Sequence, residues 1–194
     1  MLNMVDSLSK AIIEYTSKGY SLNPIISESD DYRYWVVNFT LTTCDFCADL
    51  DGRIFYNEDA LTFSPPAHQR CRCVLLKMKS ILAGTATIKG TSGVDWYLKN
   101  YGVLPNNYIT KKEAEVKGWD KSRGNLRDIL SGAIIGGDKY YDKDNALPAA
   151  IGRTWYEADI NYVGGYRGEH RLVYSNDGLV LVTYDHFNTF YPIR

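Results

Sequence analysis

The sequence contains no long hydrophobic run and no pattern typical of a secretory signal peptide. None of its apolar runs approaches the roughly 20 residues that a membrane-spanning helix needs. Its opening, MLNMVDSLSKAIIEYTSKGYSLN, lacks the basic start and the hydrophobic centre that a signal peptide carries. We therefore expect either an intracellular protein or the terminal piece of a longer protein that leaves the cell by another route.

An excess of charge of one sign is also missing. The 194 residues include 22 Lys and Arg against 23 Asp and Glu, which gives a formal net charge of −1. Such a chain cannot attract nucleic acid through its overall charge, so RNA binding must depend on a local basic patch. The hydrophobic share of 45% and the 16 tyrosines suffice for a packed core and argue against global disorder.

Internal repeats and low-complexity tracts are absent, and three regions can be distinguished along the chain. We expect an N-terminal module over residues 1–80, a linker over residues 81–91 and a second domain over residues 92–194. The linker is inferred from small, Gly- and Thr-rich residues without clear periodicity. The total length suits one or two small domains.

Helix signals open the second domain and strand signals close it. Apolar spacing and capping residues predict helices over residues 8–15, from Ser92 to Gly102, from Thr110 to Gly118, and a short turn near Asn125. Strands are predicted over residues 34–39, 154–160, 171–175, 179–183 and 187–193, with Asn176-Asp-Gly178 as a hairpin turn. Helices followed by antiparallel strands indicate an α+β fold with helices packed on one sheet face.

Glu157, Arg167, Arg171 and His186 lie on or beside these successive strands. A carboxylate can accept a proton, an imidazole can donate one, and the arginines supply fixed positive charge. Attack of a ribose 2′-OH on its own phosphate requires these three kinds of group. The alternative is that these residues are solvated surface charges on adjacent strands, which is the commoner outcome for such a pattern.

All four cysteines lie within residues 41–79, as Cys44-Asp-Phe-Cys47 and Cys71-Arg-Cys73. Two cysteine pairs facing each other across a short loop predict a structural zinc site. Because the second pair is tighter than usual, His68 competes with one cysteine for the fourth ligand position. Two disulfides are the alternative if the module works outside cells.

Residues from about Ile88 to Arg194 resemble the microbial guanyl-specific ribonucleases of the barnase family. The segments that carry the resemblance are LPNNYITKKEA (104–114), RGNL (123–126), IGGD (135–138), GRTWYEADINY (152–162), GYRGEHRLVYS (165–175) and YDHFNTFYPIR (184–194). The resemblance implies the microbial ribonuclease fold and a metal-independent endoribonuclease that cleaves single-stranded RNA to a 2′,3′-cyclic phosphate.

The resemblance also implies a role for each matched residue. Glu157 stands at the general base and His186 at the general acid. Lys111, Arg167 and Arg171 stand where the family places positive charge around the phosphate. Asp138 matches an aspartate that supports the site, and Phe187 replaces a tyrosine that lines the pocket. His170 replaces an aspartate, and we interpret it as a solvated surface residue.

The loop that the family uses to bind guanine differs in this chain. It reads Tyr140-Tyr-Asp-Lys-Asp-Asn145. Asp144 falls where the family has a glutamate and is one methylene shorter, and Lys143 replaces an arginine. The resemblance implies a preference for guanine, and the changes in this loop leave that preference open. The alternative is that Tyr140 and Tyr141 stack on a base of any kind.

Residues from about 42 to 74, TCDFCADLDGRIF…PPAHQRCRC, resemble a segment of phage Mu F-like or SPP1 gp7-like minor head proteins. Together the two resemblances imply a monomeric ribonuclease toxin at the end of a larger phage-like or polymorphic toxin protein. It would be delivered without a signal peptide, act in the target-cell cytoplasm and be held by an acidic, barstar-like inhibitor.

Two other functions would also account for parts of this sequence. One is a phage head-associated structural protein that binds nucleic acid without catalysis, which would not need an acid–base pair. The other is a zinc-ribbon nucleic-acid binder that uses Arg70, Arg72, Lys77 and Lys79, which the acidic balance of that region argues against.

Overall fold

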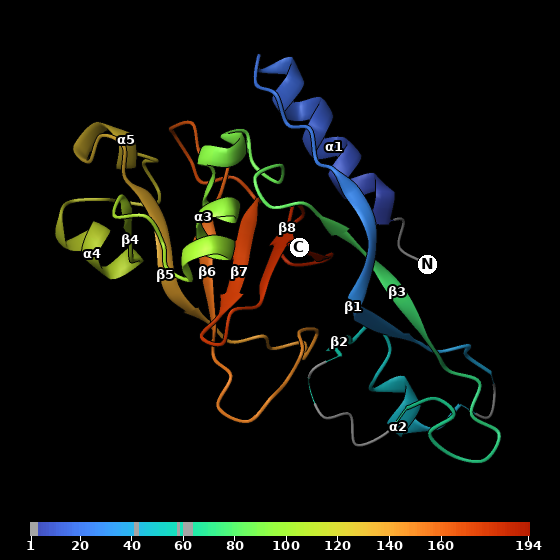
Figure 1. Cartoon of the computed structure of the whole chain (residues 1–194). Helices are drawn as coiled ribbons and strands as arrows, with labels where there is room; N and C mark the ends of the chain where they lie inside the picture. The colour runs from blue at the N-terminus through green and yellow to red at the C-terminus, as the bar shows by residue number, and fades with distance from the viewer. Residues whose placement is uncertain (1–3, 41–42, 58, 60–63) are drawn as a thin grey trace. The chain divides into compact units, whose positions relative to one another are not determined.

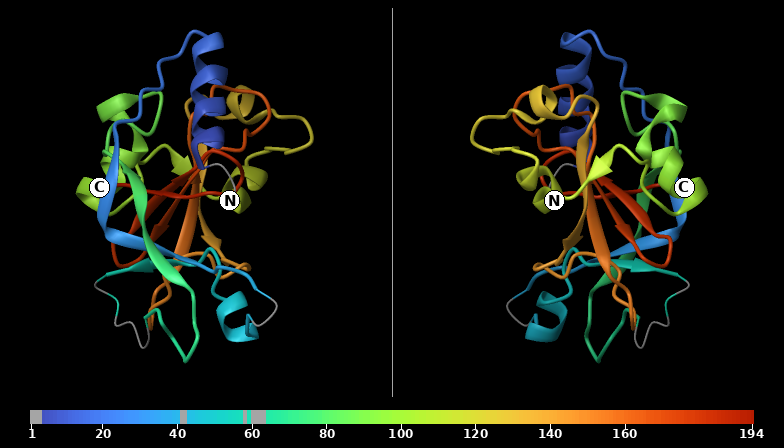
Figure 2. Two further views of the ribbon diagram at one scale, coloured as in Figure 1. Left: turned by 90° about the vertical axis from the view of Figure 1, so that its right-hand side faces the viewer. Right: turned by 90° about the vertical axis from the view of Figure 1, so that its left-hand side faces the viewer.

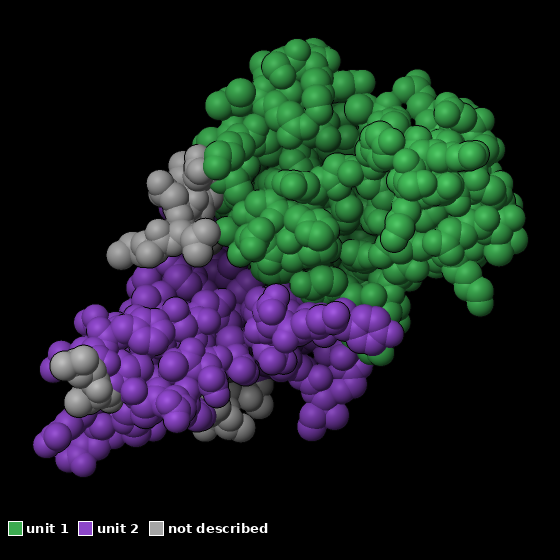
Figure 3. All heavy atoms as spheres, turned by 180° about the vertical axis from the view of Figure 1, so that it is seen from behind, with its two compact units in different colours: residues 1–27, 80–140, 154–194 green, residues 28–79, 141–153 purple. Residues whose placement is uncertain are grey.

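The structure is a computed structural model that describes residues 4–40, 43–57, 59 and 64–194. Residues 1–27, 80–140 and 154–194 form one compact unit, called unit 1, and residues 28–79 and 141–153 form a second, called unit 2 (Figures 1 and 3). Among the described residues, no helix has the length and apolar character needed to cross a membrane.

Unit 1 is built on a six-stranded sheet with the strand order β4-β5-β6-β7-β8-β9. β4 and β5 are parallel, and all other neighbours are antiparallel. The strands are β4 (Tyr108–Ile109), β5 (Ile134–Tyr140), β6 (Trp155–Asp159), β7 (Arg171–Ser175), β8 (Val180–Thr183) and β9 (Tyr191–Pro192). The predicted α+β class is confirmed.

One face of this sheet is the core face. Ala158, Leu172 and Val182 lie opposite one another on β6, β7 and β8, and Leu172 and Val182 belong to the main hydrophobic cluster. Val94 and Leu98 of the helix α3 (Val94–Tyr101) belong to the same cluster, and α3 lies across this face (Figures 1 and 2). Side chains alternate along a strand, so Glu157, Val173 and Leu181 lie on the opposite face.

Local signals account for the short helices of unit 1. α3 ends at Gly102, whose φ of 70° is the left-handed cap that glycine adopts readily. The predicted capping box of α4 (Lys111–Val116) is confirmed, because Thr110 and Glu113 exchange side-chain and backbone hydrogen bonds. The short α5 (Leu126–Ile129) follows Asn125, as predicted, but without a side-chain cap.

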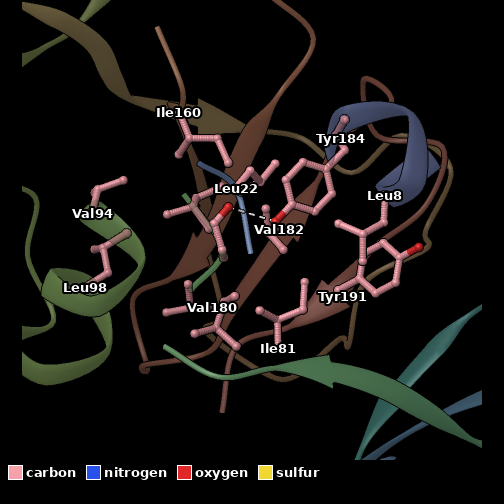
Figure 4. Close-up of a cluster of buried hydrophobic side chains, with 14 of the residues drawn as sticks. Leu8, Leu22, Ile81, Val94, Leu98, Ile160, Val180, Val182, Tyr184 and Tyr191 are labelled. Atoms are coloured by element: carbon pink, nitrogen blue, oxygen red, sulfur yellow. Dashed lines mark hydrogen bonds between the residues drawn. The ribbon is translucent and has the colours of Figure 1, made fainter. Parts of the chain in front are cut away.

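A further helix, α1 (Met4–Ser17), contributes to the core of unit 1. Leu8, Ala11 and Tyr15 lie in the same hydrophobic cluster as Tyr184 and Tyr191 of the C-terminal strands. Figure 4 shows Leu8 beside Tyr191, with the side chains of α3 on the other side of the cluster. The predicted helix over residues 8–15 is confirmed, and it packs into the core of unit 1.

The residues predicted as a linker are folded into unit 1. Asp95, which is fully buried, accepts hydrogen bonds from the backbone of Gly84 and Ala86 at 2.7 and 3.0 Å and from the Thr87 hydroxyl at 3.2 Å. A Cβ at Gly93 would stand 2.0 Å from Thr87 Oγ1, so only glycine fits beside this turn. The buried Asp95 carboxylate thus holds the backbone of residues 84–87 within unit 1. The compact units therefore divide the chain at other positions than the predicted boundaries at residues 80 and 92.

Unit 2 is organised by the three-stranded sheet β2-β1-β3. Its strands are β1 (Ile26–Val36), β2 (Ile54–Tyr56) and β3 (Val74–Ile81), and the unit boundaries fall within the ends of β1 and β3. The short α2 (Asp45–Ala48) begins after Cys44. Trp35 is 1% exposed and packs with Val37, Cys47, Leu50 and Cys73.

Strand predictions were accurate where alternation is regular and failed elsewhere. β6, β7 and β8 match their predicted ranges to within one or two residues, and the hairpin turn at residues 176–178 is confirmed. The prediction of a strand over residues 187–193 was wrong except for β9, because Asp185 ties residues 185–189 into a turn. The strand predicted at residue 34 begins at Ile26. β2, β3, β4 and β5 were not predicted.

Candidate active site

Glu157 lies in the middle of β6, with its side chain on the sheet face opposite α3. Its carboxylate forms a short hydrogen-bonded ion pair with Lys111 Nζ, although 46 residues separate the two in the chain. Lys111 is the first residue of α4, and its backbone N–H donates to Asp138 at 3.0 Å. Asp138 lies opposite Glu157 on β5, after a register shift at Gly136. The start of α4 therefore fixes the position from which the Lys111 side chain reaches the Glu157 carboxylate.

Asp159 holds both predicted phosphate-binding arginines. Arg167 donates from Nε and Nη2 to its two oxygens at 2.6 and 2.7 Å, and Arg171 Nε lies 2.9 Å from Oδ1. Burial alone would lower the pKa of Arg167, but the Asp159 hydrogen bonds and the charges of Glu157 and Asp138 raise it above its ordinary value. Burial lowers the pKa of Arg171 below its ordinary value. Because a guanidinium is not deprotonated in proteins, both arginines keep their charge on the sheet face that carries Glu157.

His186 is exposed and lies in a tight turn after β8. His186 and the following Phe187 have positive φ angles of 53° and 73°, a conformation that costs free energy for non-glycine residues. The turn is held by Thr183, whose hydroxyl accepts the Phe187 N–H at 3.0 Å, and by Asp185, which accepts the Thr189 N–H at 2.9 Å. A buried strand end and one aspartate thus present the imidazole to solvent.

Ring contacts place His186 on the same side of the sheet as Glu157. The His186 and Phe187 rings have centroids 4.9 Å apart, and Phe187 stacks on Tyr140 at 4.8 Å and 28°. Tyr140 is two residues from Asp138 on β5, so both side chains point to one face. Because Asp138 lies opposite Glu157, the imidazole, the carboxylate and the cations share that face. The structure therefore brings together Lys111, Asp138, Glu157, Arg167, Arg171, His186 and Phe187.

The other predicted substrate-binding residues belong to unit 2. Tyr141 is 71% exposed, and Lys143 and Asp144 are exposed. Between them, Asp142 accepts the backbone N–H groups of Ala146 and Leu147, both at 3.0 Å. Three side chains of the segment thus face solvent, whereas Asp142 is used to shape the turn. Their predicted contact with a base stays a prediction.

The interpretation of His170 as a solvated surface residue was wrong. His170 is 5% exposed, and its ring packs against Tyr15 of α1 and Tyr184 at centroid distances of 5.1 and 5.2 Å. Its Nδ1 lies 3.1 Å from Asn161 Nδ2, and burial lowers its pKa to about 4. The sequence of the strands did not reveal this burial because α1, which covers the ring, is distant in the chain.

The cysteine cluster lies in unit 2, and all four cysteines are free. Cys44 and Cys47 Sγ lie 3.2 and 3.0 Å from His68 Nε2, and Cys47 Sγ lies 3.8 Å from Cys71 Sγ. Two groups have ligand atoms close enough for one metal ion: Cys44, Cys47 and His68, and Cys47, Cys71 and Cys73. His68 Nδ1 contacts the Gln69 carbonyl at 2.9 Å, which leaves Nε2 free to face a metal. The residues present fit a tetrahedral metal centre.

Two contributors to the site had not been assigned from the sequence. Asp159 was not assigned a role from the sequence, yet it holds both arginines. Its position two residues after Glu157 on a strand, with two arginines nearby, was the available signal. Tyr140 was considered only as a base-stacking residue, and its contact with Phe187 could not be inferred because they lie on β5 and in the turn after β8.

Comparison with known proteins agrees with this geometry. A family model described as ribonuclease matches residues 92–194. A ribonuclease of Heyndrickxia coagulans is 51% identical over 109 residues, which cover 56% of this chain and all of that protein. Ribonucleases of Bacillus pumilus and Bacillus intermedius are 45% and 48% identical over 133 and 119 residues; these cover 69% and 61% of this chain and 81% and 74% of the relatives. The chain belongs to the barnase-type ribonuclease family and is an RNA-cleaving enzyme.

Proposed function

We propose that the chain cleaves single-stranded RNA by transesterification. Glu157 removes the proton of a ribose 2′-OH, and the 2′-oxygen forms a bond to the adjacent phosphorus. The bond from phosphorus to the 5′-oxygen breaks as His186 donates a proton to that oxygen. The products are a 2′,3′-cyclic phosphate and a free 5′-hydroxyl. The need for a 2′-OH makes RNA, and not DNA, the substrate.

The observation that carries the proposal is the position of a carboxylate among fixed cations on the sheet face that also presents an imidazole. Lys111 contacts Glu157, and Asp159 orients Arg167 and Arg171 beside it. Charged donors held in place before the reaction stabilise the charge that develops on phosphoryl oxygens. Because Lys111 pairs with Glu157, we infer that an incoming phosphate draws the lysine toward itself and releases the carboxylate.

Guanine preference is proposed for the same site. Asp144 is exposed and carries the carboxylate that could accept the two N–H groups of a guanine edge. Tyr141, also exposed, offers an aromatic face for stacking, which is worth about 1–3 kcal/mol per base and favours no particular base. The shorter side chain of Asp144 should make the preference weaker than a glutamate would.

Product analysis tests the reaction and the preference together. The purified chain is incubated with short RNAs that differ only in the base 5′ of the cleavage site, with and without EDTA. We expect cyclic-phosphate ends, fastest release after guanine and no effect of EDTA on the rate. Loss of cleavage with EDTA, or products with a 5′-phosphate, would contradict the mechanism.

A toxin role is proposed from the resemblance of residues 42–74 to phage head proteins and from the danger of an intracellular ribonuclease. In this view the chain is the toxic part of a larger, delivered protein. It acts as a monomer in the cytoplasm of a target cell and is neutralised by an acidic, barstar-like inhibitor. Induced expression should stop growth of a bacterial host, and the His186→Ala chain should not. Equal growth of both cultures at equal protein levels would contradict the proposal.

Structural zinc is proposed for unit 2. Cys44, Cys47 and Cys71 would supply three ligands, and His68 or Cys73 the fourth; the ion would fix the loops and take no part in the reaction. Metal analysis of the purified chain should find about one zinc ion per molecule. Four reactive thiols without metal, or two disulfides, would contradict a zinc centre.

A further inference from the structure

The segment that connects β5 to β6 belongs to unit 2, although both strands belong to unit 1. Figure 3 colours this segment, residues 141–153, together with residues 28–79. The segment leaves β5 after Tyr140, and the chain re-enters the sheet at Trp155, which is paired with Tyr140 in the register. Each lies two residues from a proposed site residue, Asp138 and Glu157.

Two contacts fasten this segment to the N-terminal part of unit 2. The Ile54 N–H of β2 donates to the Ala146 carbonyl at 2.8 Å. Arg153 donates from Nη1 and Nη2 to the two oxygens of Asp59 at 2.7 and 2.8 Å. Nη1 also reaches the Pro148 carbonyl at 3.1 Å, so one guanidinium holds Asp59 and the turn together.

The Asp59–Arg153 pair is buried, which separates it from ordinary surface ion pairs. The side chains are 15% and 4% exposed. Breaking a buried, bidentate pair by removing one partner leaves an uncompensated charge and is strongly unfavourable. An exposed pair contributes little. The pair is therefore able to hold the segment in one conformation.

The backbone of the segment needs such support. Asp142 and Asn145 have positive φ angles of 38° and 49°, a conformation that non-glycine residues rarely adopt. Asp142 closes the turn by accepting the Ala146 and Leu147 N–H groups, and Leu147 is 3% exposed. The exposed Lys143 and Asp144 lie within this turn, so their direction depends on how the turn is anchored.

We propose that residues 28–79 act as a specificity-positioning module, which sets the base preference of the ribonuclease by anchoring residues 141–153 through Asp59 and Ile54. Asp59 and Arg153 are positioning residues that touch no substrate. The inference rests on the proposed function, because it requires that the side chains of the β5–β6 connection contact the base. Under this proposal, residues 28–79 determine which base is preferred by the ribonuclease domain, which the family model matches at residues 92–194.

The test compares kcat and KM of the full chain and of Asp59→Asn on RNAs that carry each base 5′ of the cut. The kcat/KM ratio between the best and the poorest base should fall on the order of tenfold, the discrimination that one good base contact provides. The kcat for the poorest base should stay unchanged. Amide exchange should show faster exchange within residues 141–153.

Two further variants make the result interpretable. Lys77→Ala breaks an ion pair of the same unit, with Asp30 at 2.8 Å and side chains 44% and 86% exposed, and should change neither the ratio nor the exchange. Asp142→Ala removes the carboxylate that accepts the Ala146 and Leu147 N–H groups of the turn. It should lower the kcat/KM ratio between the best and the poorest base, and it provides the test if Asp59→Asn does not fold.

Three results would overturn the inference. One is an unchanged ratio in Asp59→Asn or Asp142→Ala when amide exchange shows that the segment is released. Another is a wild-type chain that cleaves after all four bases equally. Absence of cleavage by the wild type would overturn the proposed function, and this inference with it.

Discussion

Asp159 and Arg171 lie directly opposite each other on β6 and β7, and Arg171 Nε contacts the Asp159 carboxylate at 2.9 Å. The same carboxylate receives Arg167 through two hydrogen bonds. One buried aspartate therefore orients both guanidinium groups, and loss of its charge should affect stability and chemistry together.

Asp159→Asn should lower the free energy of unfolding by about 3 kcal/mol, because it leaves buried guanidinium charge without a partner. Urea denaturation measures this change. The matched control is Asp120→Asn, which breaks an exposed pair with Arg123 at 3.8 Å and should change the free energy of unfolding far less. Equal, small losses in both variants would contradict a structural role of Asp159.

His186→Ala and Glu157→Ala should each reduce kcat for RNA cleavage by about 10²–10⁴-fold, the usual contribution of a positioned acid or base. His186 is exposed, so its variant should unfold at the temperature of the wild type. Rates on a short RNA and circular dichroism melts check both statements. A folded His186→Ala chain with full activity would rule out the assigned acid.

Stability should fall as the pH is lowered from about 6.5 to about 4 because of His170. Burial lowers its pKa to about 4, below the unfolded value near 6.5, so the unfolded chain binds the proton more readily in this range. This stability is fully present above pH 6.5, and its loss reaches on the order of 3 kcal/mol by pH 4, at roughly 1.4 kcal/mol per pKa unit. The nearby charges are Glu14, Lys18, Arg171 and Asp185.

Urea denaturation at several pH values, repeated with His170→Gln, checks this dependence. The variant should lose the His170 part of the slope between pH 4 and 6.5 and keep the contributions of the carboxylates. An identical slope in both proteins would show that His170 is not the group responsible.

Thr110→Ala should destabilise the chain by about 1 kcal/mol, because it removes the capping box of α4. Since Lys111 follows the cap directly, kcat should also fall. Lys112→Ala, on the same helix and outside the capping box, serves as the control. Thermal melts and cleavage rates on one RNA substrate separate the two effects. A Thr110→Ala chain with wild-type stability and kcat would contradict both.

Removal of the proposed zinc should destabilise unit 2 and leave the reaction intact. Chelation, or Cys47→Ser, should increase amide exchange across residues 44–73, because Cys47 belongs to both ligand groups. The kcat on the poorest base should not change, since the proposed acid and base are side chains of unit 1. Unchanged exchange after complete metal removal would show that no ion supports these loops.

Several features of this protein could be predicted from short stretches of sequence. The helix that ends at Gly102, the Thr110–Glu113 capping box, the 176–178 hairpin and strands β6 to β8 depend on neighbouring residues, and all were found where predicted. Regular alternation also placed Glu157 and Asp159 on one strand face. The resemblance to known ribonucleases implies the same candidate site residues from the sequence alone.

Other features depend on contacts between residues far apart in the chain. The 81–91 segment looked like a linker, but the buried Asp95 carboxylate gathers its backbone into unit 1. His170 looked solvated, but α1 covers it. The 141–153 segment looked like part of the ribonuclease domain, but Asp59 and Ile54 hold it within unit 2.

The family, the chemical groups and the local elements follow from the amino-acid sequence alone, because caps, turns and alternation act over a few residues. Three-dimensional folding was needed to establish which groups share a sheet face, which carboxylate holds the arginines and which unit holds the β5–β6 connection. These depend on long-range pairs such as Lys111 with Glu157 and Asp59 with Arg153, whose partners are separated by 46 and 94 residues.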